Sequence, residues 1–584
     1  MLVSTLFALL PFVFPAAQGY SCTDDFVRAL EGQPGPEGGL LTDPLTPRGA
    51  TFGAGGRVAF TSGIAGLTRN QAVLVSDGES LRAVAIGSGG VGGSGAPAAG
   101  GDATPLGGSF AGFFADPWFA PASNAVGDVA FLADLFGAPS PRALFLQRAA
   151  TGALETVAFV GELSPSGHTL TGLGAASLDA HGDVLLLART ASGIGKADEI
   201  LSYAGGVLAL VAREGDLGPD GPYESVSGEF QLLPDGTSIA TGPVPARDEL
   251  GRIAHFAVST QTQLYGIVLD VPGQAPAWFA TFGQVTPGGG FFSSFGAPLF
   301  APNGELVFSA QYMLGSSTRK GWFAGTPGNL RAVFTTLAPI GTSLCINLER
   351  SRGPFQPLGR GGDVVLWAAV QHSDLSLGEM HLLVHGNGAI EVLAETGSVA
   401  PSGGVLAELG RFPSLDVAGR VLESARISSG PSSNAVWIRA PCGTATSYCE
   451  GKRSSLGCIP RIDSLGTASV SSAAPFLVTG DRLPSHRSAL LFYGFGTASL
   501  PFQGATLCLA APLHRTQLQT SSGPSPSDCT GTLAFDFGAR IAAGSDPALV
   551  AGAFVTAQWL VRDPLDPQGF GTALSDGLEF VVGP

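Results

Sequence analysis

With 584 residues, the chain is too long for one ordinary hydrophobic core, and we expect two domains. Because 45% of the residues are hydrophobic and only 13% are charged, an intrinsically disordered chain is excluded, while 85 Gly and 42 Pro favour short strands joined by tight turns. The net charge of -16 argues against nucleic acid or an anionic membrane as the main partner, because both favour clusters of Lys and Arg.

The N-terminal segment, residues 1–19, is predicted to be a secretory signal peptide. Residues 2–14 form an apolar run, and the small residues Ala17 and Gly19 favour cleavage before Tyr20. No Lys or Arg precedes the run, and a short buried strand or a membrane helix is the alternative. Downstream, the apolar run of residues 548–561 is too short to span a membrane. No transmembrane segment is therefore expected after removal of the signal peptide. The prediction is an extracellular or cell-surface protein.

A short motif recurs seven times along the chain, in which a turn containing Gly leads directly into a β-run. The copies are GGRVAF ending at Phe60, VGDVAF at Phe131, HGDVLL at Leu186, DGTSIA at Ala240, NGELVF at Phe308, GGDVVL at Leu366 and AGRVLE at Glu423. Each copy is followed by further apolar strands, and turns such as Asp77-Gly78 and Asn387-Gly388 between them favour tight hairpins. The pattern predicts about seven antiparallel units of four strands.

Repeated four-stranded units are typical of a β-propeller, in which no long sheet edge stays open, and a solenoid is the main alternative. The ends of the repeat region favour the propeller. The last unit lacks its third strand after residues 434–439, whereas residues 26–36 are similar to residues 210–219, the end of such a strand in another unit. We therefore predict an all-β fold in which residues 20–443 form a seven-bladed β-propeller closed by the N-terminal strand.

The cysteines fit that closure. Cys22 precedes the N-terminal strand and Cys442 follows the last repeat strand, so antiparallel pairing of the two strands predicts a Cys22–Cys442 disulfide. The alternative is a Cys345–Cys442 disulfide with Cys22 free or lipidated. Either way, seven cysteines leave one thiol unpaired.

The remaining region, residues 444–584, is predicted to be a disulfide-stapled β-sandwich. It contains strand-like runs such as ALLFYGFG, TLAFDFG and AGAFVTAQWLV, together with four cysteines. Pairing sequence neighbours gives the disulfides Cys449–Cys458 and Cys508–Cys529, which favour an oxidising compartment.

The same region carries the motifs SYCEGKRSSLGC, LLFYGFG, PFQGATLCLAAPLHRT, SDCTGTLAFDF, DPALVAGAFVTAQWLVRDP and LSDGLEF. In order and spacing they resemble a C-terminal domain shared by many large exported proteins of environmental bacteria, except that Ser454 stands where Asn is expected. The repeats likewise resemble uncharacterised repeats of exported bacterial proteins. The resemblance implies a surface, sorting or accessory module without an established activity.

Motifs that would commit the chain to a chemistry are missing from the sequence, including GxSxG, HExxH, CxxC, Walker and EF-hand patterns. His381 and His385 form an HxxxH pair near His372, but residues four apart on a strand lie about 13 Å apart, too far for one metal ion. Four acidic residues precede strands and are interpreted as turn formers: Asp179, Asp183, Asp235 and Asp363.

Two further groups are interpreted as structural. The aromatic residues Phe113, Phe114, Trp118, Phe119, Phe291, Phe292 and Phe295 could stack on sugars but are expected in the core. The groups Asp536, Arg540, Asp563 and Asp566 are scattered and do not indicate paired acid catalysis.

These patterns predict no cofactor, metal site or catalytic residue. The favoured function is a secreted or cell-surface, non-catalytic binding or structural protein whose partner is a glycan or a cell-envelope component. The alternative is an extracellular propeller-type hydrolase or lyase acting on polysaccharide. Convergence of polar side chains from several blades in one pocket would favour the enzyme.

Overall fold

The computed structural model of the chain describes residues 23–36, 38–42, 50–52, 58–66, 69–76, 81–88, 101–114, 119–124, 127–149, 151–179, 181–192, 195–226, 230–233, 238–240, 242–301, 304–349, 358–359, 362–416, 419–430, 432–441, 445–449, 451–471, 475–525, 528–550 and 553–583. Strands dominate these residues, among which there is one short helix, α1 (Phe537–Ala542). The protein is therefore all-β. The predicted signal peptide lies outside the described residues.

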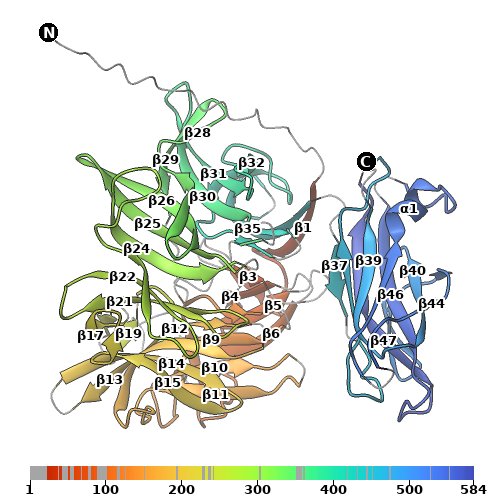
Figure 1. Ribbon diagram of the computed structural model, residues 1–584, viewed down its shortest axis with the longest axis horizontal. Helices are drawn as coiled ribbons and strands as arrows, with labels where there is room; N and C mark the ends of the chain where they lie inside the picture. Colours follow the sequence, from red (N-terminus) through yellow and green to blue (C-terminus); the bar gives the residue numbers. More distant parts are fainter. Residues whose placement is uncertain are drawn as a thin grey trace.

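Strands of residues 23–441 form seven sheets within the described part of the chain (Figure 1). Sheet one contains β2 (Leu40–Thr42), β3 (Ala50–Phe52), β4 (Val58–Ala65), β5 (Gln71–Ser76) and β6 (Leu81–Gly87). Sheet two contains β7 (Ser109–Phe113), β8 (Ala122–Ser123), β9 (Val129–Phe136), β10 (Arg142–Gln147) and β11 (Leu154–Phe159). Sheet three contains β12 (Thr169–Leu178), β13 (Val184–Ser192), β14 (Gly195–Ala204), β15 (Val207–Arg213), β18 (Phe230–Leu232) and β19 (Ser238–Ala240).

The other four sheets continue the same antiparallel arrangement. Sheet four contains β16 (Leu217–Gly218), β17 (Gly221–Ser225), β20 (Ala246–Arg247), β21 (Ile253–Ser259), β22 (Tyr265–Asp270) and β23 (Ala277–Thr281). Sheet five contains β24 (Phe291–Phe300), β25 (Leu306–Leu314), β26 (Ser317–Thr326) and β27 (Asn329–Thr335). Sheet six contains β28 (Pro339–Ile340), β29 (Ser343–Leu348), β30 (Val364–Gln371), β31 (Leu377–Val384) and β32 (Ile390–Glu395). Sheet seven contains β33 (Val405–Leu409), β34 (Ser414–Leu415), β35 (Val421–Ser428), β36 (Asn434–Pro441) and β1 (Thr23–Leu30).

One of the seven motif copies is not used as the sequence predicts. The DGTSIA run ends in β19, which pairs in parallel with β12 of sheet three. The strand before β22 in sheet four is instead β21, which a turn closed by Asp248 introduces: the Gly251 N–H donates to the Asp248 carbonyl at 3.0 Å, and Gly251 has a φ of +75°. The prediction for this copy was wrong because an Asp and a Gly precede both runs in the sequence, so the sequence pattern does not distinguish them.

The first strand joins the last repeat sheet. In the antiparallel register of β1 and β36, Phe26 lies opposite Ile438 and Leu30 opposite Ala435. This is the pairing that the sequence predicts, with the N-terminal segment completing the sheet that lacks a strand.

Each sheet buries apolar side chains against the next one. Sheets three and four, for example, share a cluster that contains Leu185 and Ile253. Sheets seven and one share another, in which Val436 packs with Phe60 and Leu41. Hydrophobic burial thus connects the last sheet to the first as it connects consecutive sheets.

The C-terminal part, residues 445–583, is a β-sandwich (Figure 1). Its larger sheet contains β37 (Ala445–Tyr448), β40 (Ser488–Gly494), β43 (His514–Arg515), β44 (Gln519–Thr520), β46 (Phe554–Arg562) and β47 (Thr572–Val581). Opposite it lie β38 (Arg461–Leu465), β39 (Leu477–Leu483) and β45 (Gly531–Asp536), and a separate hairpin is formed by β41 (Thr497–Phe502) and β42 (Ala505–Leu509). The core contains fully buried Phe476, Tyr493 and Trp559.

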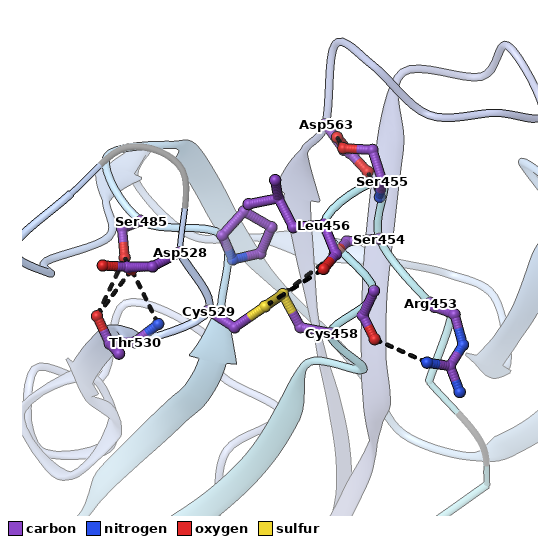
Figure 2. The surroundings of a disulfide bond; sticks show 12 residues. Arg453, Ser454, Ser455, Leu456, Cys458, Ser485, Asp528, Cys529, Thr530 and Asp563 are labelled. Atoms are coloured by element: carbon purple, nitrogen blue, oxygen red, sulfur yellow. Dashed lines mark hydrogen bonds between the residues drawn. A yellow bond between two sulfur atoms is a disulfide. The ribbon is translucent and has the colours of Figure 1, made fainter.

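Two disulfides staple the sandwich, but not between sequence neighbours. Cys449 pairs with Cys508. Cys458 pairs with Cys529, as Figure 2 shows. The predicted pairs Cys449–Cys458 and Cys508–Cys529 were wrong. Cys449 follows β37 and is bonded to Cys508 of β42. The chain between Cys449 and Cys458 forms a turn. In that turn the Ser454 N–H donates to the Cys458 carbonyl at 2.7 Å. Each bond therefore links segments far apart in the sequence.

The remaining cysteines are distributed as follows. Cys22 and Cys442 lie outside the described residues. Cys345 is buried in sheet six as a free thiol. Its Sγ atom lies 3.5 Å from the carbonyl oxygen of Asn347, and burial raises the pKa of the thiol to about 12.

Candidate functional site

A five-residue turn that leads into the first strands of several sheets recurs in the repeat region. Its sequence is x-Pro-x-Gly followed by Gly or His, and the copies span residues 35–39, 104–108, 164–168, 286–290 and 400–404. In each copy the fourth N–H donates to the first carbonyl, and the first N–H donates to the fifth carbonyl. Pro at the second position and Gly at the fourth suit this β-turn.

The fifth residue is Gly in four copies and His168 in the other. A Cβ atom at Gly108 would lie 2.4 Å from the Phe136 carbonyl oxygen, and one at Gly290 would lie 2.1 Å from that of Met313. These distances are far inside van der Waals contact, so the turns require Gly there. Gly108, Gly290 and Gly404 have a positive φ, whereas His168 does not.

His168 belongs to a polar cluster with Ser166 of the same turn and Glu199 of β14. The Ser166 hydroxyl lies 2.9 Å from Nδ1 of His168 and donates to Oε1 of Glu199 at 2.5 Å. Ser164 Oγ lies 2.7 Å from Ser166 Oγ, and the Thr190 hydroxyl donates to Glu199 Oε1 at 3.4 Å. We call Ser166, His168, Glu199 and Arg213 the Glu199 cluster.

Glu199 is fully buried at a position that carries no charge in the other sheets. In the pairing of β14 with β15, the third and fourth strands of sheet three, Glu199 lies opposite Arg213 in the last residue pair of the ladder. The residues at this third-strand position in the other sheets are Gln71, Ala143, Gly266, Gly321, Met380 and Ala435. A buried carboxylate is therefore not required by the repeat.

The cluster contains polar atoms without partners. Among the described residues, Oε2 of Glu199 and Nε of Arg213 are buried without a hydrogen bond. The Arg213 Nε atom lies 4.0 Å from Oε1 of Glu199, beyond hydrogen-bonding distance. Leaving a buried carboxylate oxygen without a hydrogen bond is costly.

Further charged groups lie beside the cluster. Asp198, next to Glu199, forms an ion pair with Arg189 at 2.9 Å and accepts a hydrogen bond from Ser225 of sheet four at 3.1 Å. Burial, together with the nearby charge of Asp198, raises the pKa of Glu214. Charged groups of both signs therefore surround the Glu199 cluster.

A second buried network joins sheets six and seven. Nδ1 of His381 lies 2.8 Å from Oε1 of Glu423, and Nε2 lies 2.7 Å from the Gly410 carbonyl oxygen. Burial by itself would raise the pKa of Glu423, but the hydrogen bond from His381 and the charge of Arg439 outweigh it and lower the pKa. His381 thus connects the Glu423 carboxylate of sheet seven to the Gly410 backbone.

The histidines of the predicted HxxxH pair have separate partners. His381 lies in the buried network, whereas His385 lies between Asp363 and Glu391. His372 contacts Ser343 at 2.9 Å. Within the described residues, no group of three or more His, Cys, Asp or Glu side chains could hold a metal ion.

Two of the acidic turn residues accept hydrogen bonds from backbone N–H groups, and Asp183 lies 3.6 Å from Arg247. Asp179 accepts hydrogen bonds from the backbone N–H groups of His181 and Asp183, both at 2.9 Å, and Asp363 accepts one from Gly386 at 2.8 Å. Asp235 lies outside the described residues.

Most of the aromatic candidates are core residues. Phe113, Phe114 and Phe119 are buried, as are Phe292 and Phe295, whereas Phe291 is 53% exposed. Trp118 lies outside the described residues.

The scattered polar groups of the C-terminal part also have separate partners. Asp536 caps α1 by accepting from the Ala539 N–H at 2.8 Å. Asp563 accepts from the Ser455 N–H at 2.6 Å and from its hydroxyl (Figure 2), and Asp566 pairs with buried Lys452 at 2.6 Å. They are not brought together as a pair of acids.

Arg540 belongs to a different cluster, around Tyr493. Its guanidinium donates to the Tyr493 hydroxyl at 2.7 Å, and that hydroxyl donates to Asp546 at 2.7 Å. His514 stacks on Tyr493 and lies 3.2 Å from Asp546. Burial raises the pKa of Tyr493 to about 12, so the phenol stays protonated and joins the sandwich through hydrogen bonds.

A pocket with a volume of about 490 Å³ lies in the sandwich. Its lining residues are Thr479, Gly480, Asp481, Gln519, Thr520, Ser522, Thr532, Leu533 and Ala534. The pocket lies between β39, β44 and β45 and carries hydroxyl and amide groups with one carboxylate.

Comparison with known proteins places the chain in a family. The model described as "Family of unknown function (DUF7453)" matches residues 30–342, which is more than half of the chain. The chain belongs to this family. The DUF7453 match includes the whole Glu199 cluster and ends before sheet seven. No curated protein matches the chain.

Several solved structures are similar to the chain at low identity. A protein of unknown function from Dyadobacter fermentans is 13% identical, with a TM-score of 0.27 and coverage of 54% of this chain and 91% of its own. The polysaccharide lyase Uly1 is 10% identical, with a TM-score of 0.32 and coverage of 68% and 89%. A puromycin-hydrolyzing peptidase from Mycobacterium tuberculosis is 12% identical, with a TM-score of 0.37 and coverage of 79% and 64%. None of these TM-scores supports a functional argument.

No helix in the described residues is long and apolar enough to cross a membrane.

Proposed function

We propose that the protein is exported and acts as a non-catalytic binding protein on or outside the cell. In this proposal residues 1–19 are a signal peptide, residues 20–443 form a seven-bladed β-propeller and residues 444–584 form an accessory β-sandwich. The β1–β36 pairing and the apolar cluster shared by sheets seven and one support a closed ring. The two disulfides of the sandwich fit an oxidising compartment.

The observation that carries a binding function is the Glu199 cluster. A fully buried carboxylate with an unpartnered oxygen lies beside a half-buried His and Ser in a turn, at a position that is uncharged in the other sheets. The fold of the turn does not require His168 or Glu199, because the other four turns form with Gly at the fifth position and without a buried carboxylate at the third-strand position. A buried polar atom without a hydrogen-bond partner needs an explanation, and a bound ligand would supply one.

The test is retention of the mature protein by an envelope fraction and by an array of immobilised oligosaccharides. We expect saturable binding to at least one of these, and binding to neither would refute the proposal. Repeating the measurement after removal of residues 444–584 tests the accessory role. Loss of envelope retention with intact array binding assigns anchoring to the sandwich, and unchanged retention refutes that role.

The Glu199 cluster also favours a second candidate, the hydrolase or lyase. Glu199 holds Ser166, and Ser166 contacts Nδ1 of His168, an arrangement that orients an imidazole as a general base. Mass spectrometry of the bound oligosaccharides after incubation distinguishes the candidates. Shortened products that require His168 would establish an enzyme, and unchanged oligosaccharides would exclude one for those ligands.

A further inference from the structure

We propose that the Glu199 cluster binds a neutral, hydroxyl-rich ligand of the saccharide class. This inference rests on the proposed binding function and assigns it a site and a ligand chemistry. Three properties of the cluster support it: its hydrogen-bond inventory, its balance of charges and its absence from the equivalent positions of the repeat.

The hydrogen-bond inventory fixes which atoms are free. The Ser166 hydroxyl has one proton, which goes to Glu199 Oε1 at 2.5 Å. Ser166 Oγ therefore accepts from Ser164 Oγ at 2.7 Å and from Nδ1–H of His168 at 2.9 Å. Neutral His168 then carries its proton on Nδ1, and its Nε2 is a free acceptor, since no described residue bonds to it.

The cluster thus offers two empty acceptors and one empty donor. The buried atoms are the acceptor Oε2 of Glu199 and the donor Nε of Arg213. The third is Nε2 of half-buried His168, whose Nδ1 contacts Ser166. A hydroxyl group donates one hydrogen bond and accepts others, so neighbouring hydroxyls of one ligand can satisfy all three atoms. Ligands that only donate or only accept would leave part of the cluster unsatisfied.

The surrounding charges favour a neutral ligand. Glu199, Asp198 and Glu214 provide three carboxylates, and Arg189 and Arg213 provide two guanidinium groups. An anionic ligand would face the three carboxylates. A cationic ligand would face Arg213, whose Nε lies 4.0 Å from the Glu199 carboxylate. A neutral polyol avoids both repulsions while using the same polar atoms.

The turn of residues 400–404 supplies a matched reference. It repeats the same backbone hydrogen bonds with Ser402 at the third position and Gly404 at the fifth. This turn leads into sheet seven, where the third-strand position equivalent to Glu199 is Ala435. A Ser in this turn is therefore compatible with the fold without the cluster, which makes Ser402→Ala the control for Ser166→Ala.

The experiment measures binding of the mature protein to an array of neutral, uronate-containing and amino-sugar oligosaccharides, followed by calorimetric titration of the best neutral probe. We expect Ser166→Ala, His168→Gly and Glu199→Gln each to weaken binding at least about tenfold, with Ser402→Ala within about twofold of the wild type. His168→Gly restores the residue that the other turns carry, so it keeps the test valid if Glu199→Gln does not fold.

Each outcome decides the inference. Loss of neutral-oligosaccharide binding in folded His168→Gly supports it. Unchanged affinity in this variant, or binding confined to charged oligosaccharides, overturns it. If the wild type binds an envelope fraction but no oligosaccharide, the saccharide assignment is wrong and the binding function stands. If it binds neither, the binding function itself is wrong.

Discussion

At the scale of single residues, the pKa of His385 is shifted by two carboxylates of sheet six. Its ring nitrogens lie 3.4 Å from Asp363 and 3.6 Å from Glu391, and these carboxylates raise the pKa of His385 to about 9. The ordinary value in an unfolded chain is about 6.5. The stabilisation of the folded protein by the ion pairs of His385 is therefore fully present below about pH 6.5 and is lost as the pH rises through about 9.

We predict that His385→Gln removes this pH dependence. Between about pH 6 and about pH 9.5, the wild type should lose about 1 kcal/mol more unfolding free energy than the variant, a small value because the side chain is 32% exposed and screened. Urea unfolding at both pH values measures the difference. Asp363, whose pKa is lowered, titrates well below this window. Parallel pH dependence in the two proteins would contradict the assignment.

The His381–Glu423 network should behave differently from surface ion pairs. Both side chains are fully buried, so Glu423→Gln removes the buried carboxylate that pairs with His381 and Arg439 and should destabilise the protein by about 3 kcal/mol. Glu408→Gln in the same sheet breaks an exposed pair with Arg426 and should cost less than about 1 kcal/mol. Urea midpoints measure both, and equal losses would show that the buried network has no special role.

At the scale of elements, the register of β1 and β36 makes a prediction about two cysteines. Thr23 lies opposite Pro441, Asp24 opposite Ala440 and Asp25 opposite Arg439, so the pairs follow one another without a shift at this end. Continuing the ladder by one step brings Cys22 opposite Cys442. We therefore predict a Cys22–Cys442 disulfide in the mature protein.

Peptide mapping without reduction tests this bond. A linked peptide pair containing Cys22 and Cys442 is expected, and Cys345 should react with a thiol reagent only after unfolding, because it is buried. Recovery of Cys22 as a free or lipidated residue, or of Cys442 linked to Cys345, would show that the ladder does not extend to the cysteines.

The sequence predicts strands and the β1–β36 pairing better than it predicts contacts between distant segments. Apolar alternation and Gly-containing turns are local signals, and the missing strand of the last unit has a recognisable counterpart near Phe26. The disulfide partners of Cys449 and Cys458 depend on how the sandwich packs. The spacing of the cysteines along the sequence carries no information about that packing. Pairing by proximity in the sequence therefore failed.

The Glu199 cluster was missed for a related reason. Ser166 and Glu199 come together only when the turn packs against β14, and neither belongs to a known catalytic motif. A partial signal was present: among the five turns with the same backbone hydrogen bonds, His168 is the one residue other than Gly at the fifth position, although the x-Pro-x-Gly runs of residues 218–222 and 338–342 carry Pro222 and Thr342 there. Comparison within the repeat is thus informative where comparison with catalytic motifs is not.

At the scale of the whole molecule, the repeat sheets and the sandwich have separate cores. The sandwich cluster around Trp559 and Phe476 contains residues of the C-terminal part alone, and both of its disulfides lie within that part. The clusters of the repeat sheets instead connect neighbouring sheets, including seven to one. We therefore predict two unfolding transitions for the full chain.

Removing one disulfide should identify the transitions. The Cys458–Cys529 bond has a sequence separation of 71 residues, and the chain-entropy description assigns about 4 kcal/mol to closing such a loop. In the Cys458→Ser, Cys529→Ser double variant, calorimetry should show one transition at a lower temperature and the other unchanged, and hydrogen exchange should locate the shifted one in residues 445–583. Because Cys22 and Cys442 are intact in this variant, a bond between them cannot account for the shift. A single transition, or a shift of both together, would instead show that the sheets and the sandwich unfold as one cooperative unit.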